Sequence, residues 1–182
     1  MRVLLSFVFL VAALCAVNSQ QYKPVDGKSD VKFAIKNFGI STSGSLNGLK
    51  GTITFNPADL PSSSFNVSVD VNTINTGIDS RDDHLKKEEY FNVEKFPSII
   101  FVSTSITKDP NGYNVTGNLT IKGITKTISF PFNVQNMVQS QDAGIILTGN
   151  FSINRKDFDV GGSSAVLGNN VDVSLKVVAV KG

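Results

Sequence analysis

The chain has 182 residues, with 17 Lys and Arg against 15 Asp and Glu. This near balance of charge excludes a strongly basic nucleic-acid-binding protein and gives no electrostatic case for binding to an anionic membrane surface. One cysteine excludes a disulfide framework, and a single histidine without cysteine partners gives no zinc-ligand spacing.

The N-terminal segment predicts export. A single basic residue, Arg2, precedes an apolar run that is too short to span a bilayer, and small residues follow it. This order is typical of a secretory signal peptide, which we place at residues 1–19. The alternative is a lipoprotein signal ending at Cys15, although a leucine precedes that cysteine where lipid attachment favours a small residue. Residues 20–182 then form one cysteine-free domain, periplasmic or secreted, with no further run long enough for stable membrane insertion.

Alternation of apolar and polar residues dominates residues 20–182. In 65–72, phenylalanine and three valines alternate with polar residues, a period that only a half-buried strand satisfies. The segment 98–106 is apolar on both faces at its start, as in a strand covered on two sides. Similar alternation predicts six more strands, at 31–36, 52–55, 113–122, 128–132, 145–153 and 171–177. Eight short strands favour an all-β antiparallel barrel or sandwich.

Turn signals and one charged segment separate these strands. The segment 79–91 is highly charged and lacks alternation, and Asp79 or Ser80 can cap a helix there. We expect a short helix and loop across one end of the barrel, stopped by Pro97. Three pairs favour positive φ or a tight hairpin: Asn47-Gly48, Asn111-Gly112 and Lys122-Gly123.

The interior of such a barrel is either filled or hollow. Of the 13 phenylalanines, 11 lie beyond residue 19, together with three tyrosines and no tryptophan. An eight-stranded barrel either fills its interior with side chains or leaves room for one small ligand. Gly117 and Gly149, on otherwise inward-facing series, indicate either room near the axis or strand bends. The residues alone leave both interiors open.

Few groups point to catalysis. The triplet Asp82-Asp83-His84 can be a cation site or an acid–base pair, but runs of charge are more often solvated faces. No serine stands in a nucleophile-elbow setting, and no glycine pair has phosphate-loop spacing. Arg155 is either a ligand for phosphate or carboxylate at the barrel mouth, or half of an ion pair with Asp82 or Asp157 that pins a loop. We expect no catalytic site, no metal and no cofactor.

Three sets of segments carry a family resemblance. The most specific set is 74–77 with Arg81-Asp82-Asp83-His84-Leu85, 90–97 and 100–104. It is preceded by 31–39 with 49–57 and followed by 117–126 with 154–158. In this order the segments resemble the YceI-like family of exported, lipocalin-like polyisoprenoid-binding proteins, over nearly all of residues 20–182.

The resemblance implies an extended eight-stranded antiparallel lipocalin-like β-barrel. Its apolar tunnel would take an isoprenoid chain, such as a prenyl pyrophosphate or a quinone tail, and a homodimer can form. Buried methylenes contribute roughly 0.8 kcal/mol each, so an apolar tube needs few polar contacts to bind tightly. We expect the tunnel to be lined by Phe33, Phe55, Val69, Phe101, Leu119, Phe130 and Phe151, and the mouth by Arg81, His84 and Arg155.

The sequence departs from the family at three positions, one of them Asp159, where relatives have glycine after the phenylalanine, and leaves other functions open. Many relatives carry histidine where this chain has Lys28 and Asn37, so a head-group contact there is lost or altered, with Lys28 as a substitute for binding an anion. We expect a non-enzymatic carrier or store of lipid. The alternatives are a structural or adhesive secreted module with a filled barrel, and hydrolysis or isomerisation at His84 with its neighbouring acids.

Overall fold

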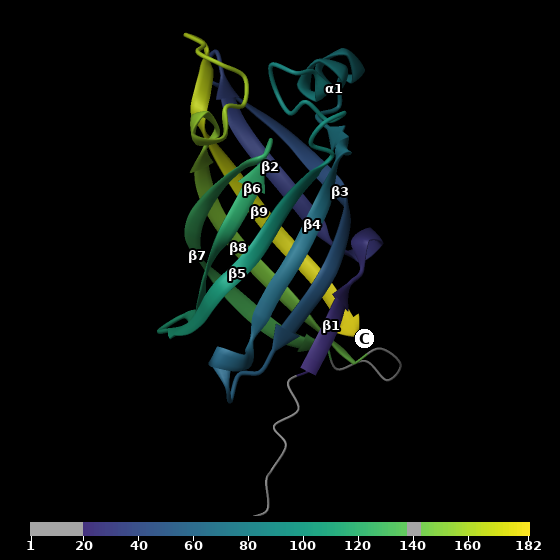
Figure 1. The fold of residues 1–182 in the computed structure, drawn as a ribbon, viewed down its shortest axis with the longest axis vertical. Helices are drawn as coiled ribbons and strands as arrows, with labels where there is room; N and C mark the ends of the chain where they lie inside the picture. Colours follow the sequence, from purple (N-terminus) through teal and green to yellow (C-terminus); the bar gives the residue numbers. More distant parts are fainter. Residues whose placement is uncertain (1–19, 138–142) are drawn as a thin grey trace, which may run out of the picture.

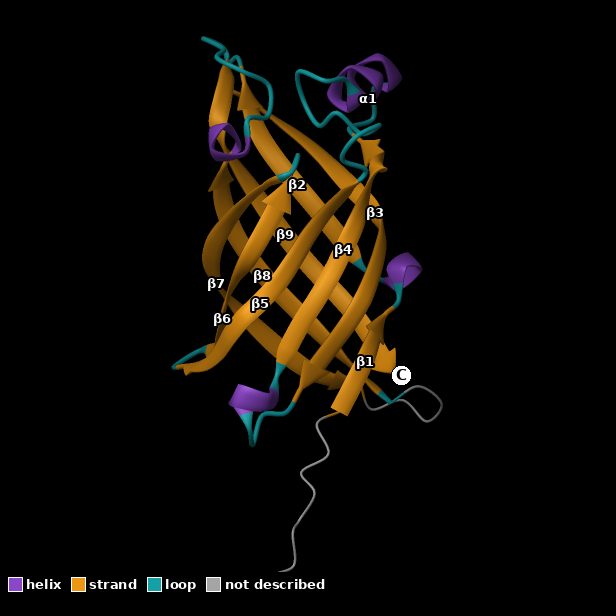
Figure 2. Ribbon diagram, in the orientation of Figure 1, coloured by secondary structure: helices purple, strands orange, loops and turns teal. Residues whose placement is uncertain are grey.

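A computed structural model describes residues 20–137 and 143–182, so the expected signal peptide lies outside the described residues. The described chain is mostly strand (Figure 2). The strands are β1 (Gln20–Pro24), β2 (Asp30–Asn37), β3 (Ile40–Phe55), β4 (Ser64–Asn75), β5 (Ser98–Asp109), β6 (Gly112–Ile121), β7 (Ile124–Met137), β8 (Gly144–Asn154) and β9 (Leu167–Lys181). The helical elements are α1 (Asp79–Lys86) and the short 3-10 turns η1 (Asp26–Lys28), η2 (Leu60–Ser62) and η3 (Arg155–Phe158).

The strands close into an antiparallel barrel (Figure 1). The order around the wall is β3-β2-β9-β8-β7-β6-β5-β4, and the pairing of β4 with β3 closes the ring. Every strand pair is antiparallel. Alternation left a barrel or a sandwich open, and the eight-stranded antiparallel barrel that the family resemblance implied is confirmed.

The N-terminal strand β1 is a finding that the sequence did not predict. β1 and β2 pair with the same two strands, β3 and β9, at different heights, so together they fill one position in the wall. Pro24 supplies no backbone N–H to continue the ladder, and η1 follows it. The Asp26 carboxylate accepts a hydrogen bond from the Leu49 N–H at 2.8 Å, which ties η1 to β3. With one buried side chain, Tyr22, β1 is too short to produce a visible alternation.

The pair Asn47-Gly48 forms a bulge instead of the expected turn. β3 runs without interruption from Ile40 to Phe55, and its register against β4 shifts on both sides of Asn47. Gly48 has φ of +73°, and a Cβ there would stand 2.8 Å from the Asp70 Cβ, so glycine is required. The pairs at 111–112 and 122–123 do join neighbouring strands, as predicted. The bulge lets one long strand bend along the barrel wall.

The charged segment forms a short helix and a loop, as predicted. α1 ends at Lys86, because Lys87 has extended backbone dihedrals, and turns follow through residues 87–96. Pro97 stands at the end of these turns, immediately before β5. The Phe91 N–H donates to the Leu85 carbonyl at 3.1 Å, which folds the turns back against α1. Helix and turns lie at one end of the barrel, as expected (Figure 1).

Candidate functional site

The half of the barrel nearest α1 contains a cavity of about 460 Å³. Inward-facing residues of most strands line it, and the turns after α1 and the loop after η3 complete its mouth. Most of the wall is aliphatic or aromatic, because these are the inward members of each alternating series. The apolar wall includes Val31, Phe33, Leu46, Val69, Ile99, Leu119, Val173, Leu175 and Val177.

Three phenylalanines form the floor of the cavity. The rings of Phe130 and Phe151 stack with centroids 4.4 Å apart, and Phe101 lies 5.6 Å from Phe130. Gly117 makes room for this floor, since a Cβ there would stand 2.6 Å from the Phe101 ring. At Gly149, by contrast, a Cβ would stand at an ordinary contact distance of 3.5 Å from the Phe130 ring, so the ring does not require glycine there. Gly117 therefore admits an aromatic ring and does not widen the cavity.

A second aromatic cluster closes the barrel beneath this floor. Phe55 packs edge-on against Tyr113 at 5.0 Å, and Phe132 stacks on Tyr113 at 5.4 Å. Phe65 contacts Phe132 at 5.3 Å; Phe55, Phe65 and Phe132 are buried with Ile53, Val115 and Ile145, and Tyr113 is partly buried against them. The cavity is therefore a blind pocket and not a tunnel open at both ends. Phe55, expected in the tunnel wall, lies in this aromatic plug outside the cavity lining.

Truncating the plug should destabilise the barrel strongly. We expect Phe132→Ala to lower the free energy of unfolding by about 3–5 kcal/mol, because it removes a ring that is only 4% exposed and leaves a void. Urea unfolding followed by circular dichroism measures this loss. Phe38→Ala is the matched control, since the Phe38 ring is 74% exposed and contributes little to the core. Equal losses in the two variants would contradict the assignment of Phe132 to the plug.

At the mouth, Arg81 and Asp82 are joined through Thr76. The Arg81 Nε donates to the Thr76 hydroxyl at 2.7 Å, and its Nη2 donates to the Thr76 carbonyl at 2.8 Å. The Thr76 hydroxyl and N–H both donate to the buried Asp82 carboxylate. This arrangement fixes α1 against the end of β4 and holds the Arg81 guanidinium in the cavity lining.

The three members of the Asp82-Asp83-His84 triplet point to different partners. Asp82 is bound to Thr76, the exposed Asp83 lies 3.9 Å from the Lys86 amine, and His84 Nδ1 lies 3.9 Å from a Glu89 oxygen. The three groups therefore do not converge on a cation or form an acid–base pair. Of the three, His84 lines the cavity, with its ring against Tyr90 at 4.9 Å.

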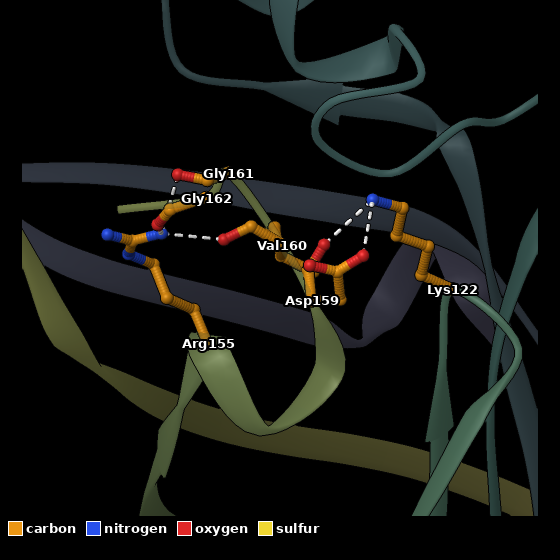
Figure 3. A network of polar contacts seen from close by, with 6 residues as sticks. All are labelled: Lys122, Arg155, Asp159, Val160, Gly161 and Gly162. Atoms are coloured by element: carbon orange, nitrogen blue, oxygen red, sulfur yellow. Dashed lines mark hydrogen bonds and ion pairs between the residues drawn. The ribbon is translucent and has the colours of Figure 1, made fainter. Parts of the chain in front are cut away.

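Arg155 is buried and holds the loop that forms the other side of the mouth (Figure 3). Its Nη1 donates to the carbonyls of three successive residues, 160–162, at 2.7–2.8 Å, and its Nε donates to the Gly168 carbonyl at 2.8 Å. Its Nη2 reaches the Leu167 carbonyl and the Asn169 side chain. The structural interpretation of Arg155 therefore agrees with its geometry, although the partners are backbone carbonyls and not Asp82 or Asp157.

The two sides of the mouth also touch each other. The Gly161 N–H donates to the Glu89 carbonyl at 2.8 Å, and the Tyr90 ring packs against Gly161. Gly161 has φ of +71°, and a Cβ there would stand 2.5 Å from the ring, so glycine is needed for this contact. The Lys122 amine reinforces the same loop by donating to the Asp159 carbonyl at 2.7 Å (Figure 3). The opening is thus narrowed on one side by a fixed contact.

Nine of the ten expected site residues line the cavity, and Phe55 is the exception. Asn37 also lies in the lining, whereas Lys28 lies in η1, outside it. Thr76 and Tyr90 lie within the segments 74–77 and 90–97 that carry the family resemblance, but the sequence assigned neither a role at the site. The role of Thr76 depends on the positions of Arg81 and Asp82, which only the folded chain shows. The alternation of β9 was visible in the sequence, but no feature identified its inward-facing residues as part of the cavity wall.

Over the described residues, no helix is long and apolar enough to cross a membrane. Among these described residues, no group of three or more His, Cys, Asp or Glu side chains is placed to hold a metal ion. The resolved pKa shifts lie away from the mouth: burial raises the pKa of Tyr22, and hydrogen bonds from Asn72 lower the pKa of Asp70. The structure therefore presents an apolar pocket with a small polar rim.

Residues 22–179 match the YceI-like domain. The chain belongs to the YceI-like family. A UPF0312 protein of Yersinia enterocolitica is 33% identical over 158 residues, which cover 83% of this YceI-like chain and 80% of the relative. A UPF0312 protein of Yersinia pestis is 32% identical with the same coverage.

Solved structures share the YceI-like barrel. BcnA of Burkholderia cenocepacia superposes with a TM-score of 0.76 at 27% identity, covering 84% of this chain and 96% of BcnA. A YCEI protein of Campylobacter jejuni has a TM-score of 0.70 at 24% identity, covering 78% and 85%. A polyisoprenoid binding domain from Saccharophagus degradans, implicated in plant cell wall breakdown, has a TM-score of 0.68 at 17% identity, covering 88% and 98%. The last two likenesses show the fold alone.

Proposed function

We propose that this YceI-like protein binds one long apolar lipid, of the polyisoprenoid class, and carries or sequesters it without chemical conversion. The blind apolar cavity of about 460 Å³ carries this proposal. Its volume falls within the roughly 300–1,000 Å³ of typical small-molecule sites. An apolar cavity of this kind holds apolar guests in preference to water, because its wall offers water few hydrogen-bond partners. Membership of the YceI-like family and a polyisoprenoid-binding neighbour of the same fold support the choice of lipid.

The geometry favours a tail-inward orientation. The floor of Phe101, Phe130 and Phe151 closes the deep end, so the end of an isoprenoid tail would lie there. Polar groups gather only at the mouth, where a head group would remain near water. Arg81 and His84 are our candidates for contact with a head group such as a pyrophosphate, because both lie in the lining. Arg155 is not, because the loop carbonyls engage its donors.

Lipid extraction is the direct test of this function. Protein purified from its natural source, without detergent, should release an isoprenoid or similar lipid into organic solvent, identified by mass spectrometry. The delipidated protein should then take up an apolar fluorescent probe, and the isoprenoid should displace it. A filled structural or adhesive module predicts no extractable lipid and no probe uptake. That pair of results would refute the carrier.

The geometry at His84 favours binding over catalysis. A general acid–base pair needs two groups within hydrogen-bond reach of the same reacting atom. Asp82 is engaged by Thr76, and the nearest carboxylate to His84, that of Glu89, is 3.9 Å away on an exposed surface. We infer from this arrangement that the protein is not an enzyme. We further propose that residues 1–19 direct export of the protein. We also propose that the protein forms a homodimer.

A further inference from the structure

We propose that the hairpin joining β2 to β3 inserts into the surface of a lipid bilayer and brings the mouth of the barrel against it. The hairpin tip is defined here as Phe38, Gly39 and Ile40, together with Val166 from the adjacent loop. The Phe38 N–H donates to the Val166 carbonyl at 2.9 Å, which joins the two segments at the tip. Docking would bring the cavity to the bilayer from which the proposed lipid cargo comes. Only this link to cargo uptake rests on the proposed function.

Exposed apolar surface is concentrated at this tip. Phe38 and Ile40 are 74% and 72% exposed, the highest values among the large apolar side chains that the structure describes. Val166 adds a third apolar side chain, 40% exposed. Single exposed apolar residues are ordinary on soluble proteins, but adjacent ones at a protruding tip mark a contact surface. In water these side chains contribute nothing to the core.

The backbone conformation at the tip indicates a functional role for the Phe38 side chain. Phe38 and Gly39 have φ of 49° and 77°, so both central residues of this two-residue turn are left-handed. Asn-Gly is the favoured pair in such turns, and a bulky residue at the first position is strained. Phe38 thus combines an unfavourable backbone conformation with an exposed ring. Insertion of the ring into a bilayer would offset both costs, as strain at functional sites is offset elsewhere.

The charge around the tip suits entry into the head-group region of a bilayer. No Asp or Glu occurs in 31–50 or in 160–171, so the hairpin and the adjacent loop carry no carboxylate that would lose its water when the tip inserts. Exposed Lys36 lies at the base of the hairpin, where its amine can reach lipid phosphates. The low net charge of the chain is not an obstacle, because this contact depends on apolar insertion and one local cation.

The tip is continuous with the cavity. Val166 and its neighbour Leu167 line the cavity, as do Ile35 and Asn37 on the hairpin side. An apolar molecule leaving a bilayer at the tip would therefore reach the cavity along apolar side chains. A tip of three such side chains is too small for a stable dimer, which buries about 800 Å² on each partner. A bilayer requires no complementary surface, so a small wedge is enough.

A tryptophan at the tip provides the first test. The chain has no tryptophan, so Phe38→Trp introduces a unique fluorophore. We expect its emission to shift to the blue on addition of vesicles of phosphatidylcholine with phosphatidylglycerol, and brominated acyl chains to quench it. Emission that neither shifts nor is quenched at saturating lipid would overturn the proposal.

Paired serine variants provide the second test. F38S/I40S should lose vesicle binding in a flotation assay by about a hundredfold, since each buried apolar side chain is worth about tenfold. The control I100S/V102S removes two apolar side chains, 39% and 40% exposed, from the outer wall of β5 and should bind like the wild type. If F38S/I40S instead converts a dimer to a monomer in sedimentation equilibrium and leaves vesicle binding unchanged, the tip is a dimer contact and the proposal is wrong.

Uptake of an apolar fluorescent probe from ethanol separates the two proposals. Phe38 and Ile40 lie outside the cavity lining, so F38S/I40S should take up the probe like the wild type. If neither protein takes up the probe while flotation still depends on the tip, lipid carriage fails and membrane docking stands. If both take up the probe and neither floats with vesicles, docking fails and carriage stands.

Discussion

Replacing Val173 by tryptophan should weaken the binding of a long apolar ligand about fiftyfold. Val173 lies in the middle of the cavity wall, opposite Phe33 on one side and Phe151 on the other in the strand register. An indole there would occupy the space of about three methylenes of ligand, and the lost burial of roughly 2.4 kcal/mol corresponds to that factor. Fluorescence titration with an apolar probe and competition with an isoprenoid measure the change.

The adjacent residue supplies a matched control. Ser174 follows Val173 on β9 and is exposed on the outer face of the barrel. Ser174→Trp adds the same indole outside the cavity and should leave the dissociation constant unchanged. Circular dichroism should show both variants folded, since neither removes a core contact. If the two variants bound the ligand equally well, the cavity would not be the binding site.

Replacing Arg155 by alanine should cost about 4 kcal/mol of unfolding free energy and should disorder the mouth. The side chain is 4% exposed and donates to the carbonyls of Val160, Gly161, Gly162 and Gly168. Removal would leave the buried Val160 carbonyl and the partly buried glycine carbonyls without this donor, and such losses are costly. Denaturant unfolding measures the stability, and hydrogen exchange of residues 160–168 measures the order of the loop.

Two further variants test whether the planar guanidinium is needed. Arg155→Lys keeps the charge but lacks the fork of donors, so it should recover only part of the lost stability. Lys156→Ala changes the exposed neighbour, whose amine makes one 3.3 Å hydrogen bond to Ser163, and should alter stability by less than about 0.5 kcal/mol. An Arg155→Ala protein as stable as Lys156→Ala would show that the loop does not depend on this residue.

Alternation predicted which side of each strand faces inward, but not how deep each residue lies. Phe55 and Phe33 both follow the inward series, and only Phe33 lines the cavity. The height of a residue along the barrel axis depends on the stagger between neighbouring strands, which bulges such as the one at Gly48 alter. These shifts have no signature in the period of a single strand.

The polar residues of the mouth were named from the sequence, but their roles were not. The sequence left two interpretations of Arg155, an ion pair or a group that binds phosphate or carboxylate. It could not show that Arg155 binds backbone carbonyls, because their positions depend on the fold. Thr76 lies in the family segment 74–77, but its connection of Arg81 to Asp82 was not predicted. Likewise, no motif predicted that the Phe38 ring would be exposed. Its exposure follows from its position in a two-residue turn.

Residue patterns predicted an all-β chain of eight alternating strands, the inward or outward direction of their side chains, and no catalytic motif. Only the closed barrel shows that one half of the interior is filled by Phe55, Phe65, Tyr113 and Phe132 while the other half is open. This difference arises because alternation is a local property of each strand. Whether inward rings meet or leave a space depends on the closure of the sheet, which brings residues from all the strands to the same height.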